Sequence, residues 1–373
     1  MEFNLDGPTI PPPEGLVPTL DNPPNGNHAA IAIITICVIL TAVCYPVRFY
    51  AKYLNEHIGV ADYLSFVAFP LFWVYVYFSY RLSWTPGYLI HMWDIRLGEI
   101  ANFTYVCFVA TLLYLWIIAL VKCAILLEWT SIFAPDGKHS FFAWACYAAC
   151  GTIALLSAII FIMDLVNCTP FEGNWNPLVP GGAVCRFAIP EFGLASSVTN
   201  LLLDMVPLVL AQRVIWGLRM SWKRKLGISA VFLIGILACV AGIVRLYYAT
   251  RFYSSNDTSY FFSIMALCSL CETTCAHLVL CVPFCPKAMT GLQKSRAVTE
   301  LKKYMSLPSY ATGTTKNSDA GGAFQDSRGM ELHPFSNKST PVNRTLGSAP
   351  GSRRDEPKCS EDSDKAVYQW NPV

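Results

Sequence analysis

The chain has 373 residues, of which 54% are hydrophobic and only 14% are charged, and its formal net charge is +2. Soluble globular proteins have about a quarter of their residues charged, so a soluble globular fold is excluded for most of the chain. Charged residues are concentrated in the last quarter, which indicates a membrane domain followed by a soluble tail. The basic residues form no single patch, and no nucleic-acid partner is expected.

Residues 1–27 are rich in proline and contain no Lys or Arg. A secretory signal would need a basic start and an early apolar core, and this segment has neither. We therefore predict a short extension on the extracellular or lumenal side, disordered or polyproline-like in conformation.

A seven-helix membrane domain is predicted for residues 28–285, because seven apolar runs follow that can each cross about 30 Å of hydrocarbon. The predicted spans are 28–49, 58–80, 102–127, 140–163, 190–212, 227–249 and 261–283. Pro70, Pro207 and Pro283 fall within or at the end of spans, where neighbouring helices can accommodate a kink. The predicted class is an all-α membrane protein.

The bias of Lys and Arg between loops predicts an outer N-terminus and a cytoplasmic C-terminus. The third inner loop decides this orientation, because it is the most basic. Its basic residues are Arg213, Arg219, Lys223, Arg224 and Lys225. Residues 286–373 form the cytoplasmic tail, in which a basic stretch at 287–303 favours anionic lipids and residues 306–373 are predicted to be disordered.

Three N-glycosylation sequons agree with this orientation, because each falls in or beside a predicted outer loop. They begin at Asn102, Asn167 and Asn256. Sequons of three residues also arise by chance, so they support the topology without deciding it. Asn102 and Asn167 are close to the predicted membrane boundary.

The predicted outer loop at 167–185 contains prolines and glycines that exclude a membrane span. Cys168 and Cys185 lie at its ends, on the oxidising side, and a disulfide between them would stabilise the fold by about 3 kcal/mol. Two unpaired thiols are the alternative. Trp175 within the loop is expected to be a packing anchor, with ligand stacking as the second interpretation.

Four of the ionisable residues within predicted spans are the sharper signals, because each is costly there unless it has a partner or a function. They are Lys122, Asp204, Arg245 and Glu272. The functional interpretations are a ligand counter-ion, a proton relay or a charge lock between helix arrangements. In the structural alternative the two bases extend to the interfaces, and the two acids are protonated or hydrogen-bonded.

The remaining cysteines give weaker signals. Cys268, Cys271 and Cys275 share one helical face, which favours close helix packing over ligation of a soft metal. Cys281 and Cys285 lie at the inner end of the last span beside basic residues and are candidates for palmitoylation. No metal site and no cofactor are predicted.

Catalytic signatures are absent from the sequence: it contains no zinc-protease, nucleophile-elbow, phosphate-loop or dinucleotide motif. His91, in the first long outer loop, is expected to be a surface residue. We therefore predict a protein without enzymatic activity.

The combined pattern resembles the fungal rhodopsin-domain integral membrane proteins, a family that includes the satratoxin-cluster type and receptor-like seven-helix proteins. The resemblance covers about residues 28–290 and rests on the outer loop, where Cys168, Pro170, Trp175, Gly182 and Cys185 match the family motif. Further matches are the segments Gly87–Asp94 and Leu120–Lys122, the pattern Asn200, Asp204 and Pro207, and the positions Lys225, Gly235 and Arg245.

The chain departs from the family pattern at three places. Leu127-Glu128-Trp129 stands where an aromatic residue followed by Arg is usual, and Asp62 alone stands where two acids are usual. An N-terminal eight-cysteine module found in some members is absent. Retinal binding is not expected, because residues 261–283 contain no lysine and Lys122 lies too near the inner face.

These observations predict a receptor-like sensor of an unknown small molecule, with a cytoplasmic signalling partner and a link to a secondary-metabolite cluster implied by the resemblance. A metabolite or proton-coupled transporter is the main alternative, and a membrane-bound accessory of a biosynthetic pathway is the second. The plasma membrane is the expected location, with an endomembrane as the alternative.

Overall fold

The computed structural model describes residues 4–53, 58–133, 141–217 and 222–285, and within them seven helices are long and apolar enough to cross a membrane. Each predicted span lies on one of these helices, so the prediction of an all-α seven-helix domain is confirmed. The helices are α1 (Asn27–Tyr53), α2 (Val60–Leu82), α3 (Ile100–Phe133), α4 (Phe141–Leu165), α5 (Ile189–Gly217), α6 (Trp222–Ser254) and α7 (Thr258–Cys281). The predicted tail at 286–373 and the basic residues of the third inner loop lie outside the described residues or side chains.

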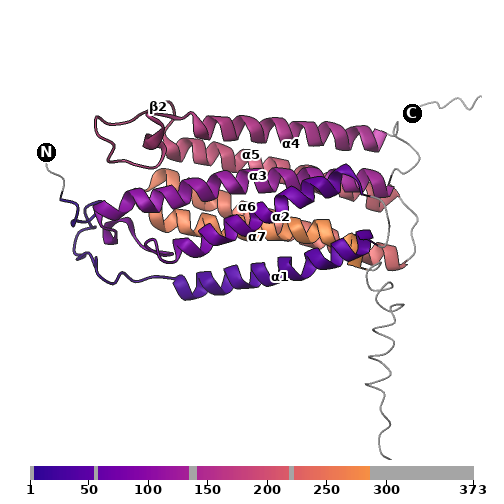
Figure 1. Cartoon of the computed structure of the whole chain (residues 1–373), viewed down its shortest axis with the longest axis horizontal. Helices are drawn as coiled ribbons and strands as arrows, with labels where there is room; N and C mark the ends of the chain where they lie inside the picture. Colours follow the sequence, from indigo (N-terminus) through magenta and orange to yellow (C-terminus); the bar gives the residue numbers. More distant parts are fainter. Residues whose placement is uncertain (1–3, 54–57, 134–140, 218–221, 286–373) are drawn as a thin grey trace, which may run out of the picture. The chain divides into compact units, whose positions relative to one another are not determined.

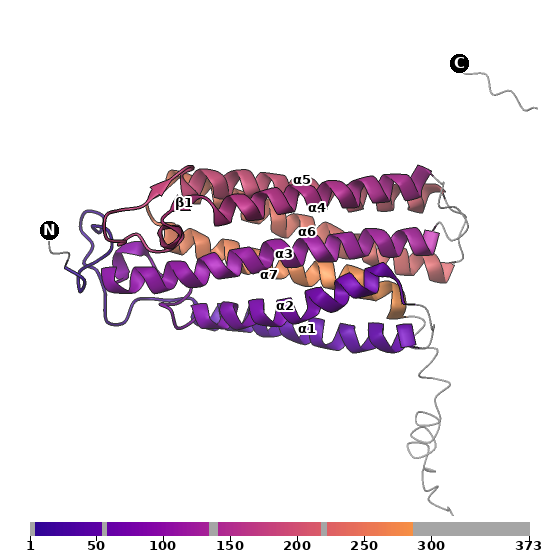
Figure 2. The same cartoon turned by 45° about the horizontal axis from the view of Figure 1, so that its top comes forward.

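The seven helices lie side by side in one bundle, with α3 and α7 in its interior (Figures 1 and 2). α3 contacts α2, α4, α5 and α7, and more than half of the apolar stretch is buried in both α3 and α7. A helix that is apolar around its whole circumference is stable only inside a protein or in lipid. α4 is the most exposed of the seven, so most of its apolar surface is free to contact lipid.

Short elements cover one end of the bundle, which we call the outer end in line with the predicted orientation. The α2–α3 loop contains two 3-10 helices, η1 (Met92–Asp94) and η2 (Leu97–Glu99). The α4–α5 loop contains strand β1 (Cys168–Thr169), 3-10 helix η3 (Phe171–Asn174) and strand β2 (Val184–Cys185). A last 3-10 helix, η4 (Val282–Phe284), follows α7 at the opposite, inner end.

The N-terminal segment has a defined path along the α2–α3 loop, in contrast to the predicted disorder. Thr9 donates its amide to the Ile95 carbonyl at 2.9 Å, and Leu97 donates to the Gly7 carbonyl at 3.0 Å. Further along, the Thr19 amide donates to the Asp94 carboxylate at 2.8 Å. Backbone and side-chain hydrogen bonds of this kind offset the entropy lost by an ordered chain. Residues 4–26 are thus part of the outer face.

A compact set of ion pairs, the inner clamp, joins three helices at the inner end. It consists of Arg48 and Lys52 on α1, Asp62 on α2 and Glu128 on α3. Each base contacts both acids, at N–O distances of 2.7 to 2.9 Å. Arg48 is almost fully buried, and it also donates to the Leu280 carbonyl of α7 at 2.9 Å. The clamp therefore holds four helices together at the inner end of the bundle.

Candidate functional site

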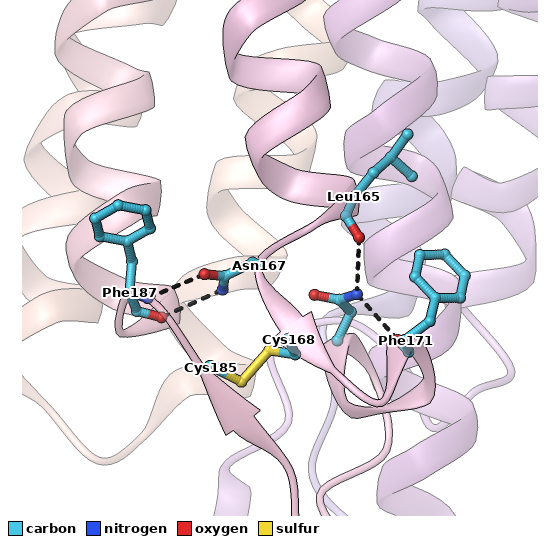
Figure 3. Close-up of a disulfide and its surroundings, with 7 residues drawn as sticks. Leu165, Asn167, Cys168, Phe171, Cys185 and Phe187 are labelled. Carbon is cyan, nitrogen blue, oxygen red and sulfur yellow. Dashed lines mark hydrogen bonds between the residues drawn. A yellow bond between two sulfur atoms is a disulfide. The ribbon is translucent and has the colours of Figure 1, made fainter.

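The α4–α5 loop is closed by a disulfide between Cys168 and Cys185 (Figure 3). The two cysteines face each other in an antiparallel two-stranded ribbon, and Thr169 pairs with Val184 beside them. The predicted pairing of the two cysteines is confirmed. A ribbon of two residues per strand has little stability of its own, so the covalent link fixes the ends of the loop above the bundle.

Asn167 holds the base of this loop in place. Its side-chain amide donates to the Phe187 carbonyl at 3.2 Å, and its side-chain oxygen accepts from the Phe187 amide at 3.0 Å (Figure 3). The residue is buried. Its side-chain nitrogen is thus engaged within the folded loop, and modification of Asn167 stays a prediction. Asn102 and Asn256 are exposed and remain predicted sites.

The other motif residues of the loop have structural roles. Trp175 packs against Tyr105 and Phe108 of α3, at ring-centroid distances of 5.7 and 5.6 Å, and its carbonyl accepts a hydrogen bond from Thr104. Pro170 precedes η3, and Gly182 has a φ of +76°, a conformation that favours glycine. Trp175 thus anchors the loop to α3, as the packing interpretation predicted.

A cavity of about 390 Å³ lies beneath the loop, in the outer half of the bundle. Most of its wall is apolar or aromatic, with contributions from α3, α5, α6 and α7. Asn167 and Asn174 line it from the loop, and Tyr114 and Arg245 line it from α3 and α6. Its volume and lining are those of a small-molecule pocket.

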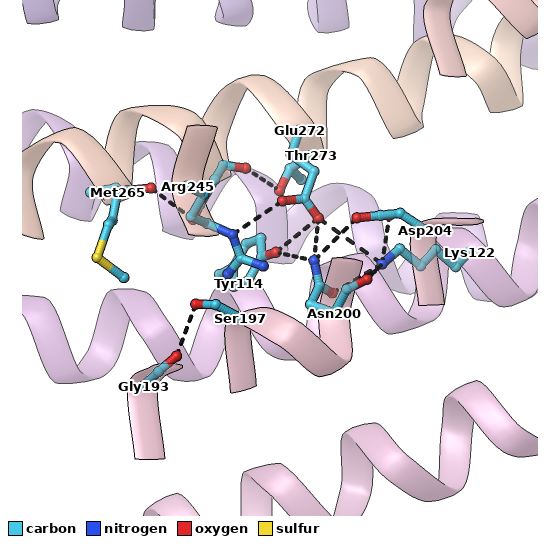
Figure 4. A network of polar contacts seen from close by, with 12 residues as sticks. Tyr114, Lys122, Gly193, Ser197, Asn200, Asp204, Arg245, Met265, Glu272 and Thr273 are labelled. Atoms are coloured by element: carbon cyan, nitrogen blue, oxygen red, sulfur yellow. Dashed lines mark hydrogen bonds and ion pairs between the residues drawn. The ribbon is translucent and has the colours of Figure 1, made fainter. Parts of the chain in front are cut away.

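Six buried residues at the inner side of this cavity form a continuous polar cluster, which we call the charge network (Figure 4). Its members come from α3, α5, α6 and α7. They are Tyr114, Lys122, Asn200, Asp204, Arg245 and Glu272. The four ionisable residues singled out within the predicted spans, Lys122, Asp204, Arg245 and Glu272, are therefore brought together by the fold.

Lys122 forms the basic centre of one half of the network. Its ammonium lies 2.8 Å from the Asp204 carboxylate and 2.9 Å from the side-chain oxygen of Asn200. Gly242 allows α6 to approach at this level, because a Cβ there would lie 3.5 Å from the Asp204 carboxylate and 3.2 Å from Leu201. Lys122 and Arg245 are both buried, so the interpretation in which these bases extend to the interfaces is wrong.

Glu272 forms the acidic centre of the other half and is fully buried. One carboxylate oxygen accepts from the Tyr114 hydroxyl at 2.9 Å and from the Asn200 amide at 2.6 Å. The same oxygen lies 4.0 Å from the Lys122 ammonium. The second oxygen lies 3.5 Å from Nε of Arg245, an ion pair without hydrogen-bond geometry. Glu272 is thus shared between the two bases.

Tyr114 was not predicted as part of the site, although it donates to Glu272 and accepts from Asn200 at 2.8 Å. Its ring also lies beneath the guanidinium of Arg245, 5.1 Å from centroid to carbon. An aromatic residue in an apolar span carries no sequence signal of its own. Its position two helical turns before Lys122 on α3 is the one feature that relates it to a predicted residue.

The weaker predictions have mixed outcomes. Cys281 is fully buried, so palmitoylation at Cys281 is incompatible with the fold, whereas Cys285 is half-buried and remains a candidate. Cys268, Cys271 and Cys275 are half-buried free thiols. His91 is not a plain surface residue: it bonds the Asp257 carboxylate at 2.6 Å and stacks between Trp93 and Tyr260.

The family profile called Fungal rhodopsin domain matches residues 47–290, a range that contains the outer loop, the cavity and the charge network. The chain belongs to the fungal rhodopsin-domain family. It is accordingly a multi-pass membrane protein. The inner clamp lies within the same matched range, so its two departures from the family pattern, Asp62 and Glu128, belong to the family domain itself.

Three relatives of this fungal rhodopsin-domain protein are informative. Fugralins biosynthesis cluster protein 2 from Gibberella zeae is 29% identical, over 93% of this chain and 87% of that protein. Receptor GIN3 from Arthrobotrys oligospora is 22% identical, over 89% of this chain and 77% of that protein. The SAT4 family membrane protein from Emericella nidulans is 27% identical, over 55% of this chain and 53% of that protein. No solved structure matches the chain.

Removal of the disulfide tests how much the loop contributes to the fold. Replacing Cys168 by serine is expected to lower the free energy of unfolding by about 3 kcal/mol, because the unfolded chain regains the freedom of the open loop. The measurement is thermal unfolding of the purified protein in lipid nanodiscs. Cys268→Ser, which removes a half-buried free thiol, is the control. Equal melting temperatures for the two variants would contradict the expectation.

Proposed function

We propose that this protein is a receptor-like sensor of a small molecule, without enzymatic activity. One observation carries the proposal: the cavity beneath the outer loop ends on two members of the charge network, Tyr114 and Arg245. That network joins α3, α5, α6 and α7, so a ligand in the cavity would contact a polar cluster on which four helices depend. The name of Receptor GIN3 supports the same class of function.

In a sensor, ligand binding at the outer end must change the packing of the helices at the inner end. A second cavity, of about 50 Å³, lies on the inner side of the charge network and is lined by Lys122, Asp204 and Glu272. Pro207 and Gly235 also line it, from α5 and α6. Gly235 faces Leu208 closely, since a Cβ there would lie 2.8 Å from that side chain. We infer that α5 and α6 repack into this space when the network is disturbed.

The proposal extends to the setting of the protein. A cytoplasmic signalling partner would bind at the inner end, where the repacking of α5 and α6 would change the surface that the partner contacts. Plasma-membrane residence suits a sensor of an extracellular molecule. The name of Fugralins biosynthesis cluster protein 2 supports a link between this chain and a secondary-metabolite cluster.

A metabolite or proton-coupled transporter is the second candidate, and the charge network favours it to a degree. Two acids and two bases lie between two cavities, which is an arrangement found where ions or protons cross a membrane. Sensor and transporter differ in what their loss does to the cell. Loss of transcription of a responding pathway supports the sensor, whereas loss of metabolite export with intact synthesis supports the transporter.

Filling the outer cavity tests the proposal directly. Ala266, on α7, lines the cavity, and Ala266→Phe is expected to occupy much of it. In the native fungal host this variant is expected to abolish the transcriptional response that a deletion strain also lacks, while the protein reaches the membrane in normal amounts. The measurement is transcript abundance together with membrane protein level.

Ala148→Phe is the matched control, because Ala148 lies on α4 with its side chain exposed on the bundle surface. It adds the same volume outside the cavity and is expected to leave the response unchanged. A normal response with Ala266→Phe would overturn the sensor proposal. Export of labelled metabolite by wild-type proteoliposomes that Ala266→Phe abolishes would favour the transporter.

A further inference from the structure

The outer cavity is lined by a side chain, Arg245, that has more hydrogen-bond donors than partners. Arg245 is 5% exposed, and its Nε and Nη2 atoms have no hydrogen-bond partner among the described residues. A guanidinium carries five N–H donors and no acceptor. Burying donors without a partner is unfavourable, and more so when the group is charged. The side chain therefore has more hydrogen-bond donors than the protein pairs, and it lines the floor of a cavity that can hold a small molecule.

Three hydroxyl groups around the cavity do not compete for this role, because their protons are already engaged. Ser197 donates to the Gly193 carbonyl at 2.8 Å (Figure 4). Ser269 donates to the Met265 carbonyl at 2.9 Å, and Thr111 donates to the Cys107 carbonyl at 2.9 Å. Each of these bonds lies within its own helix. A ligand in the cavity thus meets these hydroxyl oxygens, which can accept, the carboxyl group of Asp164 near the loop, and one guanidinium that can donate.

The charge of Arg245 is only partly offset by the protein. Its one acidic neighbour within ion-pair distance is Glu272, at 3.5 Å, among the residues that the structure describes. The other carboxylate oxygen of Glu272 accepts hydrogen bonds from Tyr114 and Asn200, and it lies 4.0 Å from the Lys122 ammonium. Asp204, by contrast, pairs with Lys122 at 2.8 Å. Arg245 is thus the base of the network with room for another acid.

We propose that the ligand of this cavity is an organic acid: a carboxylate that binds Arg245, attached to an apolar, ring-bearing body. Arg binds carboxylates through two parallel N–H···O bonds, which are among the stronger hydrogen bonds in proteins. The body of the ligand would contact the aromatic wall, to which Phe103, Phe108, Phe192 and Phe262 contribute. This inference rests on the proposed function and specifies the chemistry that the sensor recognises.

The same geometry links recognition to the charge network. A bound carboxylate competes with Glu272 for Arg245, because both would occupy the one guanidinium. Glu272 then turns to Lys122, its other base, and the contact between α6 and α7 weakens. Removing the competing charge is therefore expected to strengthen binding of the acid, an effect that a purely structural role of Arg245 would not produce.

Paired probes of equal shape test the inference. The purified full chain in nanodiscs is titrated with 2-naphthoate and indole-3-acetate, and in parallel with the methyl ester of each. The acids are expected to bind at least about tenfold more tightly than their esters. Affinities no tighter for the acids than for the esters, including the absence of binding by any acid, would overturn the inference.

Three variants locate the effect. Arg245→Gln is expected to weaken binding of the acid by about 10- to 100-fold and leave the ester unchanged, whereas Glu272→Gln is expected to strengthen it. Arg251→Gln is the matched control, because Arg251 is exposed on the same helix. Wild-type affinity of Arg245→Gln for the acids would overturn the inference. If Arg245→Gln does not fold, the acid–ester comparison on the wild-type protein decides.

Failure of this inference is distinct from failure of the sensor proposal. A chain in which Ala266→Phe abolishes the response, and Arg245→Gln retains both the response and acid binding, is a sensor of a non-acidic ligand. A chain in which the acids bind through Arg245, and Ala266→Phe leaves the response intact, has an acid site that does not serve sensing.

Discussion

Replacing Lys122 by methionine is expected to lower the free energy of unfolding by about 3–5 kcal/mol. The substitution leaves the Asp204 carboxylate buried without the ammonium that lies 2.8 Å away, and it removes a donor from Asn200. An unpaired buried charge is costly because the interior offers little solvation. Thermal unfolding in nanodiscs, followed by the loss of monodisperse protein, measures the change.

The double variant Lys122→Met with Asp204→Leu makes this expectation specific. Removing both charges takes away the unpaired carboxylate, so the double variant is expected to recover a large part of the lost stability. Arg251→Met, an exposed base on α6, is the control and is expected to change the melting temperature little. A double variant that is as unstable as the sum of its two single variants would contradict a paired role for Lys122 and Asp204.

The second large effect is expected at the inner clamp. Arg48→Met removes a side chain that contacts Asp62 at 2.7 Å, Glu128 at 2.9 Å and the Leu280 carbonyl at 2.9 Å. Two carboxylates then share Lys52 alone, and like charges at short range repel. The expected loss is again about 3–5 kcal/mol, together with faster amide hydrogen exchange at the inner ends of α1, α2 and α7.

Lys52→Met provides the internal comparison for this prediction. Lys52 contacts the same two acids at 2.9 Å, but its side chain is 15% exposed, against 1% for Arg48. Solvent therefore compensates for part of its loss, and the destabilisation is expected to be smaller. A larger effect for Lys52→Met than for Arg48→Met would show that burial does not determine the strength of the clamp.

The inner clamp also shows a limit of sequence reasoning: its residues can be noted in the sequence, but the contacts between them cannot be predicted from it. In the sequence alone, Glu128 and Asp62 stand out only as departures from a family pattern, and neither has an assigned partner. The structure explains both departures together, because Glu128 on α3 supplies a second carboxylate beside Asp62 on α2. A carboxylate on one helix thus completes an ion-pair cluster that involves a carboxylate on another helix. The order of the helices along the chain does not by itself show which of them are neighbours.

The spans could be predicted because apolar runs of sufficient length have few other uses, and the seven helices follow them closely. The charge network was predictable as four costly residues but not as one site. α3 is apolar on all sides, so its sequence does not say which face meets α5, α6 or α7. Tyr114 was missed for the same reason, and the partner of His91, Asp257, lies 166 residues away.

The distribution of the charge network along the chain has a consequence for biosynthesis. Lys122 enters the membrane with α3, whereas Asn200 follows 78 residues later and the acids Asp204 and Glu272 later still. Until α5 is inserted, the lysine stands in an apolar helix without a counter-charge. Lys122 thus gains its partners only when the later helices have docked. A change in α5 or α7 that delays their docking would leave α3 with an unpaired lysine, exposed to the quality-control machinery of the membrane.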